Sequence, residues 1–244
     1  MKWLELQESP IKGYLSHSQI FKWMTCRLAF YYRYVQKIRT ALPAKVILGL
    51  SYHNAMEASF KTKARDRWYN DIGPDAFVTD FDSAKTRTEI TWDEPQAAVR
   101  AQGLALVGLY GTQIAPTVPM TDETRVEKRM DTEIGGVKVR GYIDLISDDH
   151  ILVDHKTSGR RKKAAELQDD LQTTIYEYGM VKEGIPIAGR AWHSAVRLKK
   201  PVVEVLTAPP AADRFATLEQ VVTGVDLDMR TGNFYPSGFP KNCG

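Results

Sequence analysis

The chain has 244 residues, of which 43% are hydrophobic and 26% charged, and its formal net charge is +3. These values exclude a disordered chain, and they allow a polyanionic partner without the strongly basic footprint of a dedicated nucleic-acid-binding domain. No apolar run reaches the roughly 18 residues that span a bilayer, and residues 1–5 lack the apolar core of a signal peptide. We therefore expect one cytoplasmic unit over residues 1–244, without a membrane partner.

Hydrophobic spacing in the first half is that of helices, with apolar residues recurring every three or four positions. We expect three helices, over residues 16–39, 46–60 and 94–114. Ser16 or Ser18 is a suitable N-cap for the first of them, Pro43 interrupts the pattern after it, and Pro95 lies in the first turn of the third. Residues 1–115 are therefore predicted to form a helical N-terminal part.

After residue 116 the pattern changes to that of strands. We expect strands over residues 124–134, 137–147, 151–156, 191–198 and 202–206, and helices over residues 163–182 and 212–230. The order predicts a sheet with a crossing helix over residues 116–206, followed by a C-terminal helix and tail over residues 207–244. The predicted fold class is α/β, a mixed sheet flanked by helices.

Two aspartates interrupt neighbouring apolar strands, where a charge is costly unless it is paired or bound to metal. If the turn between these strands comprises residues 148–150, Asp144 lies directly across from Asp154 on one face of the sheet. Lys156 then points to the same face and His155 to the other. A two-residue turn would shift the register by one and place the aspartates on opposite faces.

Two adjacent carboxylates raise each other's pKa unless a cation lies between them. Oxygen ligands, one ammonium group and no nearby cysteine favour Mg²⁺ or Mn²⁺ over zinc. Such an ion can polarise a phosphodiester and activate a bound water, while Lys156 orients the water or neutralises the phosphate. Asp144, Asp154 and Lys156 are therefore the candidate catalytic residues. Ordinary strand aspartates and a chance Asp-x-Lys triplet are the alternative.

Several short motifs occur in order along the chain. Three of them are Gly141-x-x-Asp144, Asp154-x-Lys156-Thr157 and Gln172-x-x-x-Tyr176. Upstream are Leu15-Ser16-x-Ser18, Cys26-x-x-x-Phe30-x-Tyr32 and Gly49-x-x-x-His53. Together they resemble the RecB-like exonuclease branch of the PD-(D/E)XK nuclease superfamily, which includes phage exonucleases and CRISPR-associated RecB-like nucleases. The resemblance implies a restriction-endonuclease-like sheet and a metal-dependent exonuclease that acts on DNA ends in recombination, repair or replication.

The resemblance also implies a set of metal ligands. These are His53, Asp144, Asp154 and the backbone carbonyl of His155. Glu127 occupies a place where family members often carry an acidic residue near the site. From the sequence alone, His53 could instead pair with Glu57 one helical turn later, and Glu127 could be a solvated strand residue.

Substrate contacts are expected from the segment after the third strand. Gln172 and Tyr176 lie four residues apart, with Gln168 one turn earlier, on one stripe of the expected helix. The resemblance implies that Gln172 and Tyr176 hold substrate phosphate or position the catalytic lysine; a core tyrosine and a capping glutamine are the alternative. Arg160 and Arg161 begin a run of four positive charges, interpreted as DNA-backbone contacts or as a solvated helix start.

Many members of this branch bind a [4Fe-4S] cluster through one cysteine in the first helix and three near the C-terminus. Only Cys26 and Cys243 are present here, so we expect no complete cluster in this chain. The two cysteines would be remnants of such a site or part of a truncated one.

DNA ends, single- or double-stranded, are the partner that the resemblance implies, and a recombination protein such as a single-strand annealing protein is a further candidate. Two other functions stay open. The chain could be a catalytically weak DNA-binding subunit of a recombination or CRISPR spacer-acquisition complex, or a metal-dependent hydrolase for another substrate.

Overall fold

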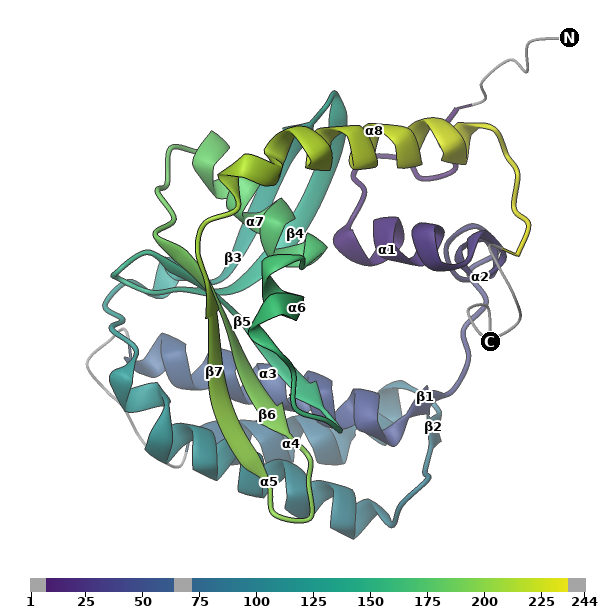
Figure 1. The fold of residues 1–244 in the computed structure, drawn as a ribbon. Helices are drawn as coiled ribbons and strands as arrows, with labels where there is room; N and C mark the ends of the chain where they lie inside the picture. Colours follow the sequence, from purple (N-terminus) through teal and green to yellow (C-terminus); the bar gives the residue numbers. More distant parts are fainter. Residues whose placement is uncertain (1–7, 64–71, 237–244) are drawn as a thin grey trace, which may run out of the picture.

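The computed structural model describes residues 8–63 and 72–236. At its centre is a five-stranded mixed sheet in the order β3-β4-β5-β6-β7 (Figure 1). The strands are β3 (Val126–Ile134), β4 (Val137–Ile146), β5 (Ile151–Ser158), β6 (Gly189–Val196) and β7 (Val202–Ala208). Neighbouring strands are antiparallel except β5 and β6, which are parallel. The predicted α/β fold is confirmed.

Eight α-helices are described around this sheet. They are α1 (His17–Thr25), α2 (Arg27–Phe30), α3 (Ala44–Lys63), α4 (Ile72–Arg87), α5 (Gln96–Gln113), α6 (Ala164–Gln168), α7 (Leu171–Lys182) and α8 (Phe215–Arg230). Two short parallel strands, β1 (Leu42–Pro43) and β2 (Ile90–Thr91), form a separate pair. None of the helices within residues 8–63 and 72–236 combines the length and apolar character needed to cross a bilayer.

The helices cover the sheet on both faces. Helices α3 and α5 pack on one face, with α4 against both of them, and Phe60 and Leu106 meet Val153 of β5 in one apolar cluster (Figure 1). Helices α1, α7 and α8 cover the other face, where Trp23 and Ile143 belong to a second cluster. Burial of both faces is consistent with the apolar run that begins β5 and with the burial of every residue of β6.

The prediction of a single helix over residues 16–39 is wrong, because the first helix ends at Cys26. Ser16 begins α1 through a capping box, accepting a hydrogen bond from the Gln19 amide at 3.3 Å while Gln19 accepts one from the Ser16 amide at 2.7 Å. Cys26 has an extended backbone, and its sulfur accepts a hydrogen bond from the Ala29 amide at 3.4 Å, which starts a second helix. That helix continues as a π-helix, Tyr31–Val35.

The helix expected over residues 163–182 is also interrupted. The Asp170 carboxylate accepts a hydrogen bond from the Thr173 amide at 2.8 Å and thereby caps a new helix, α7. Gln168 therefore belongs to α6 and does not share a helical stripe with Gln172 and Tyr176, contrary to the expectation. Helix α4 was not predicted.

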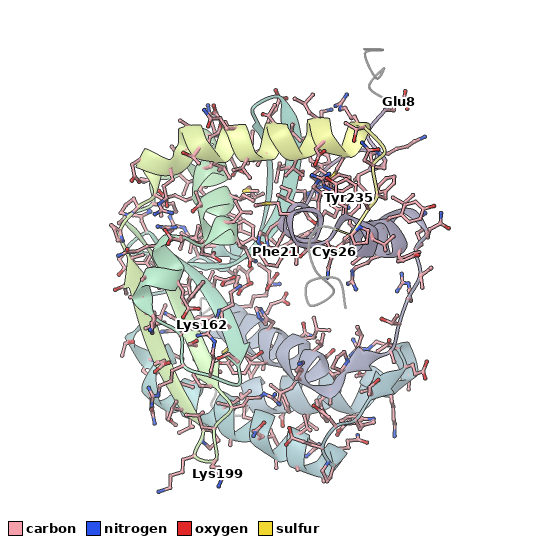
Figure 2. All side chains as sticks on the ribbon, turned by 45° about the vertical axis from the view of Figure 1, so that its right-hand side comes forward. Glu8, Phe21, Cys26, Lys162, Lys199 and Tyr235 are labelled. Atoms are coloured by element: carbon pink, nitrogen blue, oxygen red, sulfur yellow. The ribbon has the colours of Figure 1, made fainter. Side chains whose placement is uncertain are left out.

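The C-terminal segment returns to α1 and α2. The Arg27 guanidinium lies 4.6 Å from the centre of the Tyr235 ring, and Phe234 contacts Trp23 with ring centres 5.7 Å apart. Figure 2 shows Tyr235 and Cys26 on this side of the molecule. Cys243, the second cysteine of the expected cluster remnant, lies outside the described residues.

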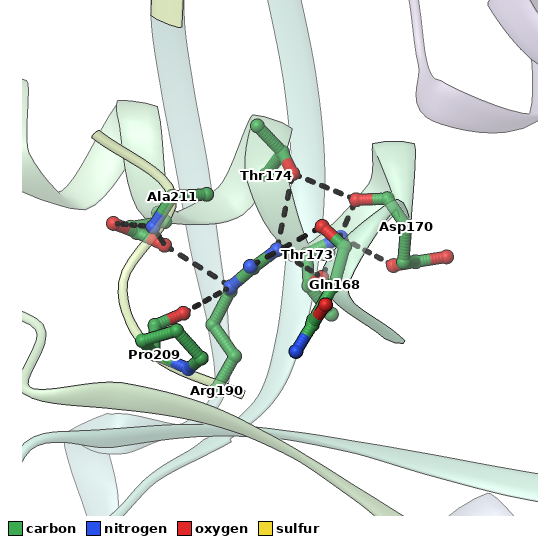
Figure 3. Close-up of polar contacts among 8 residues, drawn as sticks. Gln168, Asp170, Thr173, Thr174, Arg190, Pro209 and Ala211 are labelled. Atoms are coloured by element: carbon green, nitrogen blue, oxygen red, sulfur yellow. Dashed lines mark hydrogen bonds and ion pairs between the residues drawn. The ribbon is translucent and has the colours of Figure 1, made fainter. Parts of the chain in front are cut away.

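A buried ion pair links α7 to strand β6 of the sheet (Figure 3). Arg190 of β6 and Glu177 of α7 each have side chains only 2% exposed, with Arg190 Nε 3.4 Å from Glu177 Oε2. Glu177 also accepts hydrogen bonds from the Ala211 amide at 2.8 and 2.9 Å, and the Arg190 guanidinium donates to the Thr174 hydroxyl at 3.1 Å. These bonds offset the cost of burying two charges and hold the helix that carries Gln172.

Candidate functional site

The turn between β4 and β5 has three residues, the length that the predicted register requires. It comprises residues 148–150, because the Ser147 amide donates to the Ile151 carbonyl at 3.0 Å and His150 takes a left-handed backbone, with φ 62°. The pairs on its strand side are Ile146 with Leu152 and Leu145 with Val153. Continued by one pair, the same offset would bring Asp144 opposite Asp154, a pair that the ladder does not include.

Pairing between β4 and β5 ends just before that position. Only two residue pairs join these strands, whereas eight join β5 to β6, so β4 and β5 diverge (Figure 1). In place of a ladder bond, the Asp144 carboxylate accepts a hydrogen bond from the His155 amide at 2.6 Å. The candidate residues gather where the ladder ends. This place, between Asp144 on β4 and Asp154 on β5, is called the opening.

The ladder between β3 and β4 is interrupted beside the same point. Glu127 has a left-handed backbone with φ 50°, and neither it nor Asp144 is paired across the ladder, although the register on both sides is unchanged. A left-handed backbone is costly for a residue other than glycine, and such strain concentrates at functional sites. Here it accompanies the approach of two carboxylates from adjacent strands.

Three side chains form a group suited to a metal ion. Ligand atoms of His53 on α3, Glu127 on β3 and Asp144 on β4 all lie within 4.8 Å of one another, and each residue is half-buried. His53 Nδ1 is 3.4 Å from Asp144 Oδ2. The alternative partner of His53, Glu57, is instead paired with Lys61 at 2.5 Å. Helix α3 thus brings His53 to the strand opening.

Electrostatics in this group favour a cation. Burial, together with repulsion from Asp144 and Glu57, raises the pKa of Glu127 to about 7. Burial also acts to raise the pKa of Asp144, but the hydrogen bond and charge of His53 outweigh it and the pKa is lowered. One imidazole nitrogen and two carboxylates are ligands that Mg²⁺ and Mn²⁺ accept, so the residues present fit such an ion.

A second set of residues lies on the α7 side of the opening. Lys156 Nζ is 2.6 Å from Asp154 Oδ2 and donates a hydrogen bond to Gln172 Oε1 at 2.8 Å, and Gln172 Nε2 is 3.0 Å from the Tyr176 hydroxyl. Among the described residues, Asp154 is not in the group whose ligand atoms lie within 4.8 Å of one another. The structure therefore places Asp144 with His53, and Asp154 with Lys156.

The two sets remain electrostatically linked. Burial raises the pKa of Asp154 to about 6, and the negative charge of Asp144 adds to this increase against the opposing effect of Lys156. Burial acts to lower the pKa of Lys156, but the attraction of Asp154 outweighs it and the pKa is raised. Lys156 is therefore held as a cation beside the opening.

Close packing explains why two positions of the motifs are glycine. A Cβ atom on Gly141 would lie 2.4 Å from the ring of Tyr176, and one on Gly49 would lie 2.9 Å from Thr157 Oγ1. Gly141 thus lets α7 lie close to β4, and Gly49 lets α3 lie close to β5. Both helices carry candidate site residues, so the glycines control the width of the site.

Arg160 and Arg161 project from the loop after β5. Their side chains are 68% and 59% exposed, and they pair with Glu166 and Glu204, respectively. Lys162, from the same run, is labelled beside this loop in Figure 2, and its ammonium lies 4.2 Å from the centre of the Trp192 ring. The cations are thus accessible to a polyanion, and DNA contact by Arg160 and Arg161 stays a prediction.

His155 points away from Lys156 into the core on the α3 side. Its ring stacks on Phe60 with centres 5.9 Å apart, next to His193, whose Nδ1 lies 2.7 Å from the Tyr110 hydroxyl. Burial lowers the pKa of His193 to about 4. Sequence alone did not single out this buried histidine.

His193 is expected to make folding pH-dependent. Its folded pKa lies below the unfolded value, so the unfolded chain alone takes up the proton as the pH falls from 6.5 towards 4, and stability is lost in that window. Between pH 6 and 5, the free energy of unfolding measured in urea should fall by up to about 1.4 kcal/mol more in the wild type than in His193→Gln. An equal loss in both proteins would contradict this assignment.

Comparison with known proteins agrees with the geometry. There is no match among curated proteins. The crystal structure of a provisionally named exonuclease from Eubacterium rectale superposes with a TM-score of 0.62, covering 91% of this chain and 83% of its own, at 12% sequence identity, which indicates a shared fold. The family model described as the PD-(D/E)XK nuclease superfamily matches residues 14–244. The chain therefore belongs to the PD-(D/E)XK nuclease superfamily.

Proposed function

We propose that this protein is a Mg²⁺- or Mn²⁺-dependent deoxyribonuclease of the RecB-like branch that hydrolyses phosphodiester bonds at DNA ends. One observation carries the proposal. Where β4 and β5 diverge, His53, Glu127 and Asp144 form a group that could hold a metal ion, and Lys156 is held as a cation by Asp154 and Gln172. A phosphodiester bound beside both sets would be contacted by the ion and by the lysine.

The acidic side of the opening is proposed to hold the ion. His53, Glu127 and Asp144 would supply ligand atoms, and Asp154 and the backbone carbonyl of His155 would complete the set from β5. When bound, Mg²⁺ or Mn²⁺ polarises the phosphodiester and lowers the pKa of a bound water. Asp144 keeps its orientation because it accepts the His155 amide hydrogen bond at 2.6 Å.

Lys156 is proposed to offset the negative charge that develops on the phosphate. Its raised pKa keeps it protonated, and the Gln172 amide oxygen at 2.8 Å fixes the ammonium group. Gln172 is fixed in turn by Tyr176, which is buried against Gly141. Such preorganisation of charge is a large contribution to catalysis because little rearrangement is needed during reaction.

Action at DNA ends, in recombination, repair or replication, is proposed from the motifs and is supported by the name of the Eubacterium rectale protein. Arg160 and Arg161 would contact the DNA backbone next to the site. A single-strand annealing protein is a fitting partner for an enzyme that produces single strands from DNA ends.

A direct test uses linear single-stranded DNA, linear double-stranded DNA and closed circles, each incubated with Mg²⁺, Mn²⁺ or EDTA. We expect linear DNA to be degraded from its ends with either ion, circles to persist, and EDTA to stop the reaction. Lys156→Ala should abolish degradation. The matched control is Lys199→Ala, an exposed lysine on the hairpin between β6 and β7, which should retain it (Figure 2).

Other outcomes would redirect the proposal. Cleavage of closed circles would make the enzyme an endonuclease. Tight DNA binding without cleavage by either ion would favour a DNA-binding subunit, and failure to bind DNA at low salt would favour a hydrolase for another substrate. Equal activity of Asp154→Ala, Lys156→Ala and the wild type would reject the catalytic assignment.

A further inference from the structure

Tyr142 of β4 stands between two cavities. One, of about 540 Å³, is lined by His53, Glu127 and Asp144, the group proposed to hold the metal ion. The other, of about 500 Å³, is bounded by residues 12–18, by Arg140 and Gly141 of β4, and by Gln172 and Tyr176 of α7. Tyr142 lines both cavities, so an extended ligand that occupies both would pass its ring.

The Tyr142 side chain is unusually open for a large aromatic group beside a site. It is 51% exposed and lies two residues before Asp144 on the same strand. Within the part of the chain that the structure describes, its hydroxyl makes no hydrogen bond and its ring no aromatic or cation contact. Tyr14, in contrast, is covered by the Arg140 guanidinium at 4.0 Å, and Tyr176 is bonded to Gln172.

Positive charge lies at both ends of this path. Lys12 lines the cavity beyond Tyr142, as does Arg140, whose guanidinium is paired with Asp131 at 2.5 Å. On the other side, a third cavity of about 430 Å³ shares Leu42 and Thr88 with the metal-group cavity. Its cations, Arg33, Lys37 and Arg39, form no ion pair with any residue that the structure describes. Cations flanking an acidic centre suit a polyanion that runs through a metal site.

We propose that Tyr142 is a stacking residue for an unpaired base of the substrate strand, next to the phosphate that is cleaved. The inference rests on the proposed function and adds that the substrate is single-stranded where it crosses β4. A base inside a duplex is stacked on both faces, so only an unpaired base can place its face on a protein ring. Stacking accepts any base, as an enzyme without sequence preference requires.

The test measures binding without cleavage. Fluorescence anisotropy of labelled single-stranded oligonucleotides with Mg²⁺ is compared in Lys156→Ala proteins that carry either Tyr142 or Tyr142→Ala. Each oligonucleotide contains one abasic position, moved along the strand, because an abasic nucleotide keeps its phosphate but has no base to stack. Tyr142→Phe keeps the ring, and Tyr32→Ala is the control, since Tyr32 is 48% exposed and lines neither cavity.

With Tyr142 present, one abasic position should weaken binding about 5- to 100-fold. Tyr142→Ala should weaken binding of the intact strand by a similar factor, and the abasic position should then have no further effect. Tyr142→Phe and Tyr32→Ala should bind as the parent does.

Unchanged binding by Tyr142→Ala, or an undiminished abasic effect in it, would overturn the inference while leaving the nuclease proposal intact. Stronger binding of blunt duplex than of single strands would also overturn it. If no variant binds DNA and the wild type cleaves none, the proposed function itself fails, which is a distinct result. Thermal unfolding of each variant checks that the fold is kept.

Discussion

Asp144→Asn is expected to lower the rate of DNA hydrolysis by at least about 10²- to 10³-fold. Asp144 interacts with His53 at 3.4 Å and with the His155 amide at 2.6 Å, so it joins the helix, both strands and the expected ion. The substitution keeps the shape of the side chain but removes its charge. Single-turnover cleavage of end-labelled DNA measures the rate.

Metal binding gives a readout that does not depend on activity. The wild type should unfold at a higher temperature with Mn²⁺, corresponding to about 2.7 kcal/mol when the free ion is 100-fold above its Kd. Asp144→Asn should lose most of this increment. The matched control is Asp82→Asn, a 46%-exposed aspartate on α4 that pairs with Arg100 and should retain it. An unchanged increment in Asp144→Asn would show that the ion binds elsewhere.

The same measurement separates the two acidic sets. Glu127 lies within the group of ligand atoms, whereas the Asp154 carboxylate lies 2.6 Å from Lys156 Nζ. Glu127→Gln should therefore reduce the Mn²⁺ increment if the ion binds the observed group. A reduction by Asp154→Asn alone would show instead that the ion draws Asp154 away from Lys156 and that Glu127 is not a ligand.

Arg190→Met is expected to destabilise the fold by about 3–5 kcal/mol, because it leaves Glu177 buried without its counter-charge. Both side chains are 2% exposed, so water cannot replace the lost interaction. The substitution also removes hydrogen bonds to the Thr174 hydroxyl and the Pro209 carbonyl. Urea unfolding followed by circular dichroism measures the change in free energy.

Two comparisons make this prediction specific. The double variant Arg190→Met with Glu177→Gln should cost less than the sum of the single variants, since neither charge is then left alone. Arg100→Ala, which breaks an exposed pair with Asp82 on α4, should cost far less than Arg190→Met, because water replaces an exposed interaction. Equal costs for Arg190→Met and Arg100→Ala would show that the buried pair contributes little to stability.

Local pattern predicted the strands and the turn because both depend on neighbours in the sequence. The alternation of apolar residues placed β3, β4 and β5 within two residues of their observed ends, and the turn at residues 148–150 set the register around Asp144. The apolar spacing did not predict where these helices are interrupted. At Cys26 and Asp170 a side chain caps the following helix, and apolar spacing continues across both breaks.

The sequence by itself determined the α/β class, the order of helices and strands along the chain, and the superfamily motifs with Asp144, Asp154 and Lys156. Only the tertiary structure decided that His53 and Glu127 meet Asp144, and that Asp154 pairs with Lys156. Spacing within a strand specifies which face a side chain points to, but not which distant helix packs there. That choice depends on the packing of α3 and α7 on opposite faces of the sheet and on the divergence of β4 from β5.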